Sequence, residues 1–399
     1  MRRHKGDVTI AIFTALLMMI GLIVIYAIGP LRANFMNSIY GTTTSPDSFF
    51  HKQLFVVVVS IIAFILAYNS SFDLIKKLSR PTLLTGLGSC ILLMLLALAK
   101  SKLARCELGA CRWFNFGSIG FQPAELLKIG IIFYFADLIS ARKKSGKFEN
   151  SSDFWLPFSA ISAASLFFTI VVQKDLGTGA SIMAIILAML LASGISLKKF
   201  SLILLAIAVS GVLFILTSSH RMERLTTFKG GSGANTYHID NAMLAIGTGG
   251  LFGVGVGNSI QATGYLPESI NDSIFAVMGE TFGFFGLAVV MGLFYFLLRS
   301  LLVSANKMMD EQKRLILVGV FAWLGAHVAI NIMAMTGLIP LTGITLPLLS
   351  FGGTSMLFVG GMVGLCFMLS RYTEREEIAD LVSKKSPLDT RQLSRRIRL

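Results

Sequence analysis

The sequence predicts an all-α polytopic membrane protein with about ten transmembrane helices and large outer loops. Three observations predict this class. The chain of 399 residues is 54% hydrophobic and only 14% charged, whereas soluble domains carry about 25% charged residues. Apolar runs recur along the whole chain, as crossing a hydrocarbon core requires. Basic residues cluster in alternate loops, which is the pattern that the positive-inside rule produces.

Ten segments are expected to span the membrane as one domain. No soluble linker divides them, so residues 1–370 are expected to form a single membrane domain and residues 371–399 a charged, flexible cytoplasmic tail. The first span follows a basic N-terminus but is too long for the apolar part of a signal peptide, so an uncleaved helix is expected. The predicted spans are residues 8–28, 54–68, 82–98, 125–139, 154–172, 180–194, 202–217, 273–298, 315–336 and 355–370.

Polar residues between the spans support this order. Pro123 suits the first turn of the fourth span. A tight turn at residues 174–177 separates the fifth span from the sixth. Asp272 is placed at or near the N-cap of the eighth, where Asp is favoured. Several spans are shorter than about 20 residues, so their ends must extend into the flanking sequence.

Charge fixes the predicted orientation. Of the 35 Lys and Arg residues, 24 lie in the termini and in the loops on the same side as the termini, which we therefore expect to be cytoplasmic. This distribution argues against nucleic-acid binding as the reason for the net charge of +14. Ten basic residues oppose the bias on the outer side. An anionic ligand and ordinary loop solvation both explain Arg32, Lys52, Lys100, Lys102, Arg105, Arg112, Lys174, Arg221, Arg224 and Lys229.

Three outer loops are unusual, at residues 101–122, 218–271 and 337–353. Irregular backbone at membrane depth is tolerated only where it lines a cavity or is covered by protein. Cys106 and Cys111 share the first loop, where a disulfide and two free thiols both fit. The glycine-rich run 253–257 lacks the strand–turn–helix setting of a nucleotide site, so a flexible loop that packs closely, near a glycan or phosphate, is expected.

Asp272 is the leading candidate for chemistry. A carboxylate between a long polar loop and a long apolar helix lies at the membrane surface. N-capping alone explains an Asp here, but helix-terminus N–H groups also favour the ionised form that a general base needs. Glu280, eight residues later, is expected either to border the same cavity or to make a buried structural hydrogen bond.

Glu125 and Lys128 are ionisable groups inside an apolar span. Such groups are costly and usually pair or line a polar cavity. Their i, i+3 spacing allows mutual neutralisation; the alternative is that Lys128 faces a diphosphate. No Ser/His/Asp triad is evident. No HExxH helix or histidine cluster indicates a metal site, although a divalent cation such as Mg²⁺ would suit diphosphate chemistry.

At these residues the chain resembles the SEDS family (shape, elongation, division and sporulation), which includes FtsW, RodA and SpoVE. The matching blocks follow the family's order. They are Arg112-Trp113-Phe114, residues 121–128, Asp175-Leu176-Gly177, residues 249–253, Leu266-Pro267-Glu268 with Asp272, Gly279-Glu280, and residues 337–353 with Ser350.

The resemblance implies a peptidoglycan glycosyltransferase that polymerises lipid II into a growing glycan strand and releases undecaprenyl diphosphate. It implies a class B penicillin-binding protein and other division proteins as partners, in a bacterial cell membrane with the active site outside. The family's essential acid corresponds to Asp272. The family's Trp, Glu and Lys correspond to Trp113, Glu125 and Lys128. The leaving diphosphate needs cations, for which the candidates are Arg112, Lys128, Lys174, Arg221 and Arg224. The other predicted substrate-binding residues are Asp175, Glu280 and Ser350.

The chain departs from the family pattern at several positions. Lys174 stands where the family usually has Pro, Ser273 where it has Phe, and His238 where it has Gln. Val254 replaces a residue that is often basic, and Thr281 one that is commonly acidic. Asp272 itself is kept, so the implied activity is unaffected.

Rival functions remain open at this point. A flippase or transporter of a lipid-linked precursor fits ten spans, but the polar features gather on one outer face rather than at mid-membrane. A noncatalytic scaffold for a penicillin-binding protein is a third reading. Residues 265–268 favour the FtsW division branch over a RodA-like elongation polymerase.

Overall fold

The structure, a computed structural model, describes residues 6–107, 109–117, 119–148, 151–216 and 234–372. Most of these residues are helical. The helices are α1 (Val8–Tyr40), α2 (Ser48–Asn69), α3 (Phe72–Leu98), α4 (Pro123–Lys144), α5 (Ser152–Leu166), α6 (Leu176–Ala192), α7 (Leu197–Leu216), α9 (Ala234–Thr248), α10 (Ile274–Asn306), α11 (Glu311–Met335) and α12 (Gly353–Leu369).

Each predicted span overlaps one of these helices, and the span 154–172 also covers a π-helix, Phe167–Val172, that continues α5. Within the described residues, six segments are long and apolar enough to cross a membrane: Val8–Ile39, Ser48–Asn69, Phe72–Leu98, Ser152–Val172, Ile274–Asn306 and Glu311–Met335. The helices α6 and α12 are apolar but shorter. The multi-pass helical class is thus confirmed, and the count of ten crossings stays a prediction.

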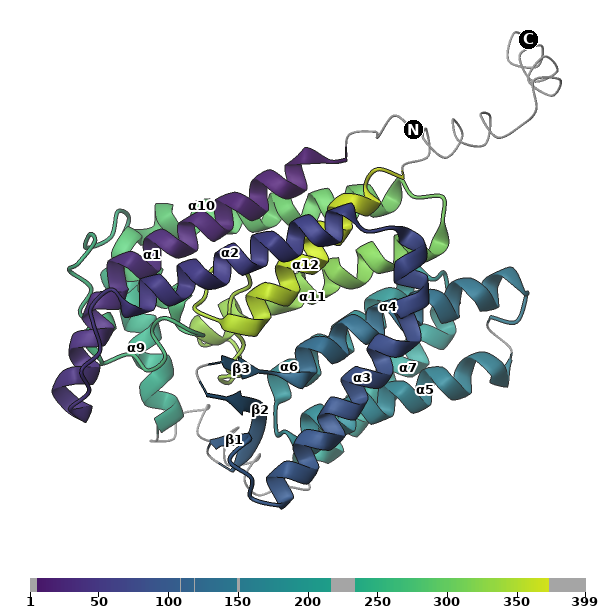
Figure 1. The fold of residues 1–399 in the computed structure, drawn as a ribbon, viewed down its shortest axis with the longest axis horizontal. Coiled ribbons are helices and arrows are strands. Elements are labelled where there is room, and N and C mark those ends of the chain that lie inside the picture. Colours follow the sequence, from purple (N-terminus) through teal and green to yellow (C-terminus); the bar gives the residue numbers. More distant parts are fainter. Residues whose placement is uncertain (1–5, 108, 118, 149–150, 217–233, 373–399) are drawn as a thin grey trace, which may run out of the picture.

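Two elements were not expected from the sequence. The predicted loop 218–271 contains α9 and a short 3₁₀ turn, Gln261–Thr263. The predicted loop 101–122 folds into a three-stranded antiparallel sheet with the order β1 (Ala104–Glu107), β2 (Ala110–Phe116) and β3 (Ile119–Phe121). Both elements lie at the same end of the molecule (Figure 1).

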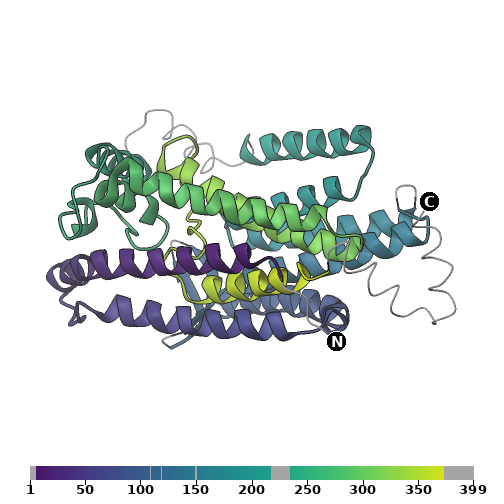
Figure 2. The ribbon, with the colours of Figure 1, turned by 90° about the horizontal axis from the view of Figure 1, so that it is seen from above.

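The long helices run side by side along the long axis (Figures 1 and 2). The pairs α2 with α12, α3 with α4, α6 with α11 and α10 with α11 pack most extensively. Helix α11 is central, because it contacts α4, α6, α9, α10 and α12. Side chains that face this packed interior carry the core, whereas many large hydrophobic side chains on α2 and α10 are exposed, as lipid contact requires.

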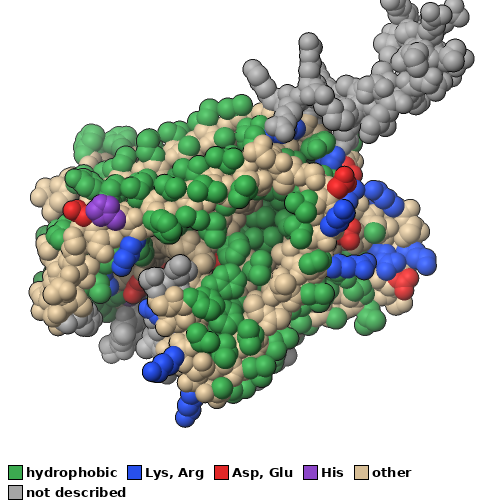
Figure 3. Space-filling model, viewed as in Figure 1, with side chains coloured by type: hydrophobic (Ala, Val, Ile, Leu, Met, Phe, Trp, Pro, Cys, Tyr) green, Lys and Arg blue, Asp and Glu red, His purple; other side chains and the backbone are tan. Residues whose placement is uncertain are grey.

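The two ends of the described chain lie together, opposite the sheet. The backbone N–H of Asp7 donates to Ser370 Oγ at 2.8 Å. Basic loops gather at this end: Lys143 pairs with Glu311 at 2.9 Å, and Lys313 lies over the ring of Tyr372 at 4.1 Å. Figure 3 shows Lys and Arg side chains concentrated there and hydrophobic side chains over the middle of the molecule. This arrangement fits the predicted charge asymmetry.

Glycines allow the loop that follows α9 to pack against the backbone of α10. A Cβ on Gly253 would meet the carbonyl of Thr281 at 2.2 Å, and one on Gly283 would meet Gly253 N at 2.4 Å. Gly283 has φ 67°, which breaks the helical path of α10. Across the break, Val254 N donates to Glu280 O at 2.9 Å and Phe284 N to Gly250 O at 2.9 Å. Gly253 in the glycine-rich run therefore packs closely on α10, whereas Gly257 of the same run is exposed and a Cβ there would meet nothing within 4 Å.

Glycines on α12 also allow close approach of α2. A Cβ on Gly364 would lie 2.4 Å from the carbonyl oxygen of Phe64 and 2.7 Å from its Cα. A Cβ on the neighbouring Gly361 would meet only Ala63 Cβ, at an ordinary 3.8 Å. The two glycines thus differ in whether backbone blocks a side chain, which makes a matched pair.

We expect Gly364→Ala to destabilise the protein by about 1–3 kcal/mol, because backbone must shift to admit the methyl group. Gly361→Ala should leave stability within about 0.5 kcal/mol. Thermal unfolding in one detergent would compare the two variants. Equal melting midpoints would contradict the close α2–α12 contact.

Candidate active site

Asp272 lies in a tight turn that leads into α10. Within this turn, Asn271 N and Ser273 N both donate to Glu268 O, at 2.9 and 3.2 Å, and Ser273 Oγ donates to Pro267 O at 2.9 Å. The N-cap of α10 is Ser273. Asp272 therefore stands one residue before the cap, and its carboxylate is left for another role.

The Asp272 carboxylate is partly buried. Its Oδ1 atom is inaccessible to solvent and has no hydrogen-bond partner among the described residues, although the residue as a whole keeps some exposure. Burial, and then the nearby charge of Glu268, raise the pKa of Asp272 from 3.8 to about 7. A carboxylate with such a pKa can take up and return a proton near neutral pH.

Asn331 on α11 joins the Asp272 turn to the irregular segment 337–352. Its Nδ2 donates to Asp272 O and to Ile344 O, both at 2.7 Å, and the residue is 1% exposed. Phe351 N adds a bond to Ile270 O at 2.8 Å. A Cβ on Gly343, which has φ 72°, would lie 4.0 Å from Asp272 Oδ2. The segment thus passes directly beside the carboxylate.

The sequence did not single out Asn331. The available signal was a polar residue four positions after His327 in an apolar span, which places both on one face of a helix. The two carbonyl groups that Asn331 binds could not be read from the sequence.

A second group forms where the sheet meets α6. Asp175 caps this helix: its Oδ1 accepts from Thr178 N at 3.0 Å and its Oδ2 from Thr178 Oγ1 at 2.9 Å. Gln122 Nε2 donates to the same Oδ2 at 3.3 Å. Arg112 lies 4.0 Å from Asp175 and donates to the carbonyl oxygens of Gln173 and Lys174, at 3.2 and 2.7 Å. Three predicted site residues, Arg112, Lys174 and Asp175, therefore meet.

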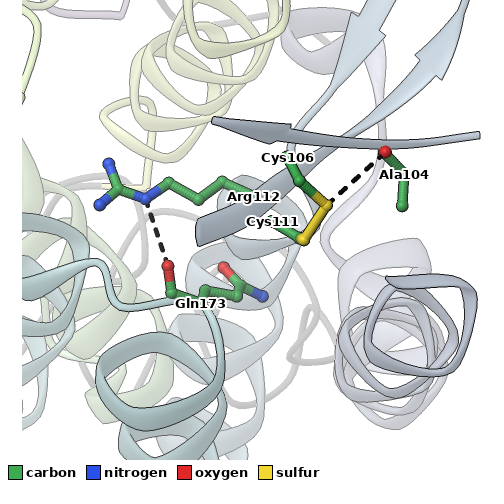
Figure 4. The surroundings of a disulfide bond; sticks show 5 residues. All are labelled: Ala104, Cys106, Cys111, Arg112 and Gln173. Carbon is green, nitrogen blue, oxygen red and sulfur yellow. Dashed lines mark hydrogen bonds between the residues drawn. A yellow bond between two sulfur atoms is a disulfide. The ribbon is translucent and has the colours of Figure 1, made fainter. Parts of the chain in front are cut away.

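A disulfide joins Cys106 to Cys111 beside Arg112, which decides between the two alternatives left by the sequence. The two cysteines are cross-strand partners in β1 and β2. Figure 4 shows the bond next to the base of the Arg112 side chain, which reaches across to the Gln173 carbonyl. Lys174, with φ 50°, is exposed and its Nζ lies near Gly109 in the β1–β2 turn.

The Asp175 and Asp272 groups are linked through packing. A Cβ on Gly177 would meet Ile344 Cγ1 at 2.6 Å and Thr342 O at 3.0 Å, so the start of α6 lies against the segment that also borders Asp272. Trp113 on β2 is partly exposed, and its ring lies against Gly120 of β3. The three outer loops thus converge on one region.

Lys128 and Glu125 form a buried ion pair on α4. Lys128 Nζ lies 2.9 Å from Glu125 Oε1, with side-chain exposures of 0% and 4%. It also contacts His327 Nε2 at 3.1 Å and lies 4.5 Å from the centre of the Trp323 ring. Trp323, His327 and Asn331 follow one another at successive turns of α11. Mutual neutralisation is the arrangement observed, and contact of Lys128 with a diphosphate stays a prediction.

Glu280 and Ser350 hold loops in place. Glu280 is 3% exposed; its carboxylate accepts from Ser259 Oγ at 2.5 Å and from Ile260 N at 3.0 Å. This is the structural hydrogen bonding that was one of the two alternatives left open by the sequence. Ser350 Oγ accepts from Leu346 N at 2.8 Å. Arg221 and Arg224 lie outside the described residues.

Within the part of the chain that the structure describes, no group of three or more His, Cys, Asp and Glu side chains could hold a metal ion. The chemistry available here is that of a partly buried carboxylate, Asp272, and of two cations, Arg112 and Lys174, in the neighbouring group around Asp175.

These features define a multi-pass membrane protein with a polar site at one end of its helices. The chain matches the family model described as cell cycle protein, FtsW/RodA/SpoVE, over residues 7–375. It therefore belongs to the FtsW/RodA/SpoVE family, and the SEDS resemblance seen in the sequence is confirmed.

Two relatives are matched over almost their full length. The chain is 32% identical over 384 residues to stage V sporulation protein E of Bacillus subtilis (strain 168), covering 93% of this chain and 99% of the relative. It is 29% identical over 377 residues to the probable peptidoglycan glycosyltransferase FtsW of Geobacter sp. (strain M18), covering 93% and 98%.

Two solved structures share the fold. One, from work on polymerization and crosslinking by a peptidoglycan synthase complex, superimposes with a TM-score of 0.71 at 22% identity, covering 93% of this chain and 99% of that chain. The other is the rod shape determining protein RodA of Thermus thermophilus, with a TM-score of 0.65 at 22% identity, covering 92% and 98%.

We expect loss of the disulfide to loosen the hairpin that carries Arg112. Cys106→Ser with Cys111→Ser should destabilise the hairpin by about 2 kcal/mol, from the loop-closure entropy of a short ring. Hydrogen–deuterium exchange at residues 104–116 should rise accordingly. A thiol reductant should have the same effect on the unchanged protein and none on the double variant; an effect on both would contradict the assignment.

Proposed function

We propose that this chain is a peptidoglycan glycosyltransferase that polymerises lipid II during septal cell-wall synthesis. One observation carries the proposal: a partly buried carboxylate, Asp272, with a pKa near 7, stands at the junction of three outer loops. Membership of the FtsW/RodA/SpoVE family, and the naming of relatives as probable peptidoglycan glycosyltransferases, support the reaction.

In the proposed reaction Asp272 acts as general base. Its carboxylate accepts the proton of an acceptor sugar hydroxyl as that oxygen attacks the anomeric carbon of the donor sugar. The bond between this carbon and the diphosphate oxygen breaks, and undecaprenyl diphosphate leaves. Attack from the opposite face converts an α-linked donor into a β-linked product. The proton then passes from Asp272 to solvent, for which a pKa near the working pH is suited.

The leaving diphosphate needs cations as its charge develops. Arg112 and Lys174 are the described candidates, because both lie at the accessible rim around Asp175. Lys128 is neutralised by Glu125 in this conformation, so its use would require the buried pair to open. Arg221 and Arg224 are further candidates from the sequence.

The proposed setting is the bacterial cell membrane, with both termini cytoplasmic and Asp272 outside. The joined ends of the chain and the basic loops beside them support this orientation. A disulfide in the loop near the site fits an oxidising outer compartment. A class B penicillin-binding protein is the proposed partner, together with other division proteins, because one structural neighbour comes from a complex that polymerises and crosslinks.

We expect Asp272→Asn to abolish polymerisation of lipid II, with a loss of at least about 100-fold, because the amide cannot accept the hydroxyl proton. Polymer length and yield would be followed on gels at fixed protein level, with and without the partner. Undiminished polymer would remove Asp272 as the base. Transfer of labelled lipid II between liposome leaflets without polymer would favour the flippase instead.

We expect the rate of polymerisation to fall on the acidic side of pH 7. The base must be ionised, and the raised pKa of Asp272, about 7, places half of the protein in the inactive protonated form there. Below this pH, kcat/KM should drop about tenfold per pH unit. A profile that stays flat down to pH 5 would contradict the role of this carboxylate.

A further inference from the structure

Two of the departures from the family pattern contact each other beside Asp272. His238, on α9, lies with its Nε2 2.6 Å from Ser273 Oγ, on the residue that caps α10. The two are 35 positions apart in sequence. Ser273 is 0% exposed and His238 is partly buried. The contact thus ties α9 to the residue that follows the carboxylate.

The direction of this hydrogen bond follows from the second hydrogen bond that the Ser273 hydroxyl makes. Ser273 Oγ lies 2.9 Å from Pro267 O, and a carbonyl oxygen can only accept, so the serine proton is directed there. Ser273 Oγ must then accept from His238 Nε2–H. Burial lowers the pKa of His238, while Glu268 opposes the shift. The imidazole is therefore a neutral donor near pH 7.

The Asp272 turn is consequently held from two sides. From α11, Asn331 binds the Asp272 carbonyl at 2.7 Å. From α9, His238 binds the Ser273 hydroxyl, which in turn closes the turn onto Pro267. These two restraints fix the backbone from which the Asp272 side chain projects.

We propose that His238 is a positioning residue for Asp272, acting through Ser273 to hold the carboxylate in its partly buried, reactive orientation. The proposal rests on the function proposed above, in which Asp272 is the base. His238 does not touch the reacting atoms, so its effect is on the placement of the base rather than on proton transfer.

The groups that face Asp272 make the prediction specific. Glu268 faces it from its own turn, and His238 on α9 contacts Ser273, the residue that follows Asp272. From α11 and the segment 337–352, the facing groups are Asn331 and Gly343, which do not titrate. Release of the turn would bring the carboxylate into water, so its pKa would fall toward the ordinary value and the acidic limb of the rate profile would move to lower pH.

The test compares His238→Ala, His238→Gln and Ser273→Ala in lipid II polymerisation, with kcat, KM and the pH profile measured for each. His238→Ala should lower kcat about tenfold, as loss of one orienting hydrogen bond does, with KM within about twofold and the acidic limb shifted downward. His238→Gln keeps an N–H donor and should restore most of the rate and the original limb. Ser273→Ala should reproduce the deficit.

Controls separate this proposal from the function on which it rests. The His238→Ala, Ser273→Ala double variant should be no slower than either single variant, because both remove one link. Asp240→Asn, exposed on α9, should match the parent in rate and melting midpoint. A normal kcat and pH limb in His238→Ala, or deficits that multiply in the double variant, would overturn the positioning role. Polymerisation by Asp272→Asn would instead overturn the proposed function.

Discussion

The side-chain amide of Asn331 donates to backbone carbonyl groups at two places where the chain is not helical. Buried backbone that leaves helical geometry needs hydrogen-bond partners from the rest of the protein. Asn331 supplies one to Asp272 and one to Ile344 from a single buried nitrogen. The turn before α10 and the segment after α11 are thereby held together, and the carboxylate sits at their junction. Every other feature of the site is arranged around this junction.

The buried charge of Lys128 in the same interior is paired. Lys128 meets a carboxylate, an imidazole and an indole ring, and these partners come from α4 and α11. The stripe of Trp323, His327 and Asn331 therefore connects a buried ion pair to the backbone beside Asp272 along one helix face. The cations at the accessible rim, on β2 and before α6, stand on separate elements that meet only in the folded protein.

The sequence predicted the parts of this structure that depend on local pattern. The helical spans, the place of Asp272 within one residue of a cap, and the i, i+3 pairing of Glu125 with Lys128 all follow from spacing and hydrophobicity. The sheet was missed because its strands are short and lie in a polar loop. The roles of Asn331 and His238 were missed because their partners are a backbone carbonyl 59 residues away and a hydroxyl 35 residues away. Such contacts arise from packing of distant elements and leave no periodic signal.

Main-chain contacts hold Gly253 against Gly283, so the two ends of the stretch between these glycines lie together. The ends of this stretch are thereby fixed relative to each other, and Asp272 lies between them. A single-residue insertion or deletion there cannot be absorbed at either glycine, so it must be taken up between them, either in the exposed loop that follows Gly253 or in the turn that carries Asp272. Only a change in the exposed loop would leave the position of the acid untouched.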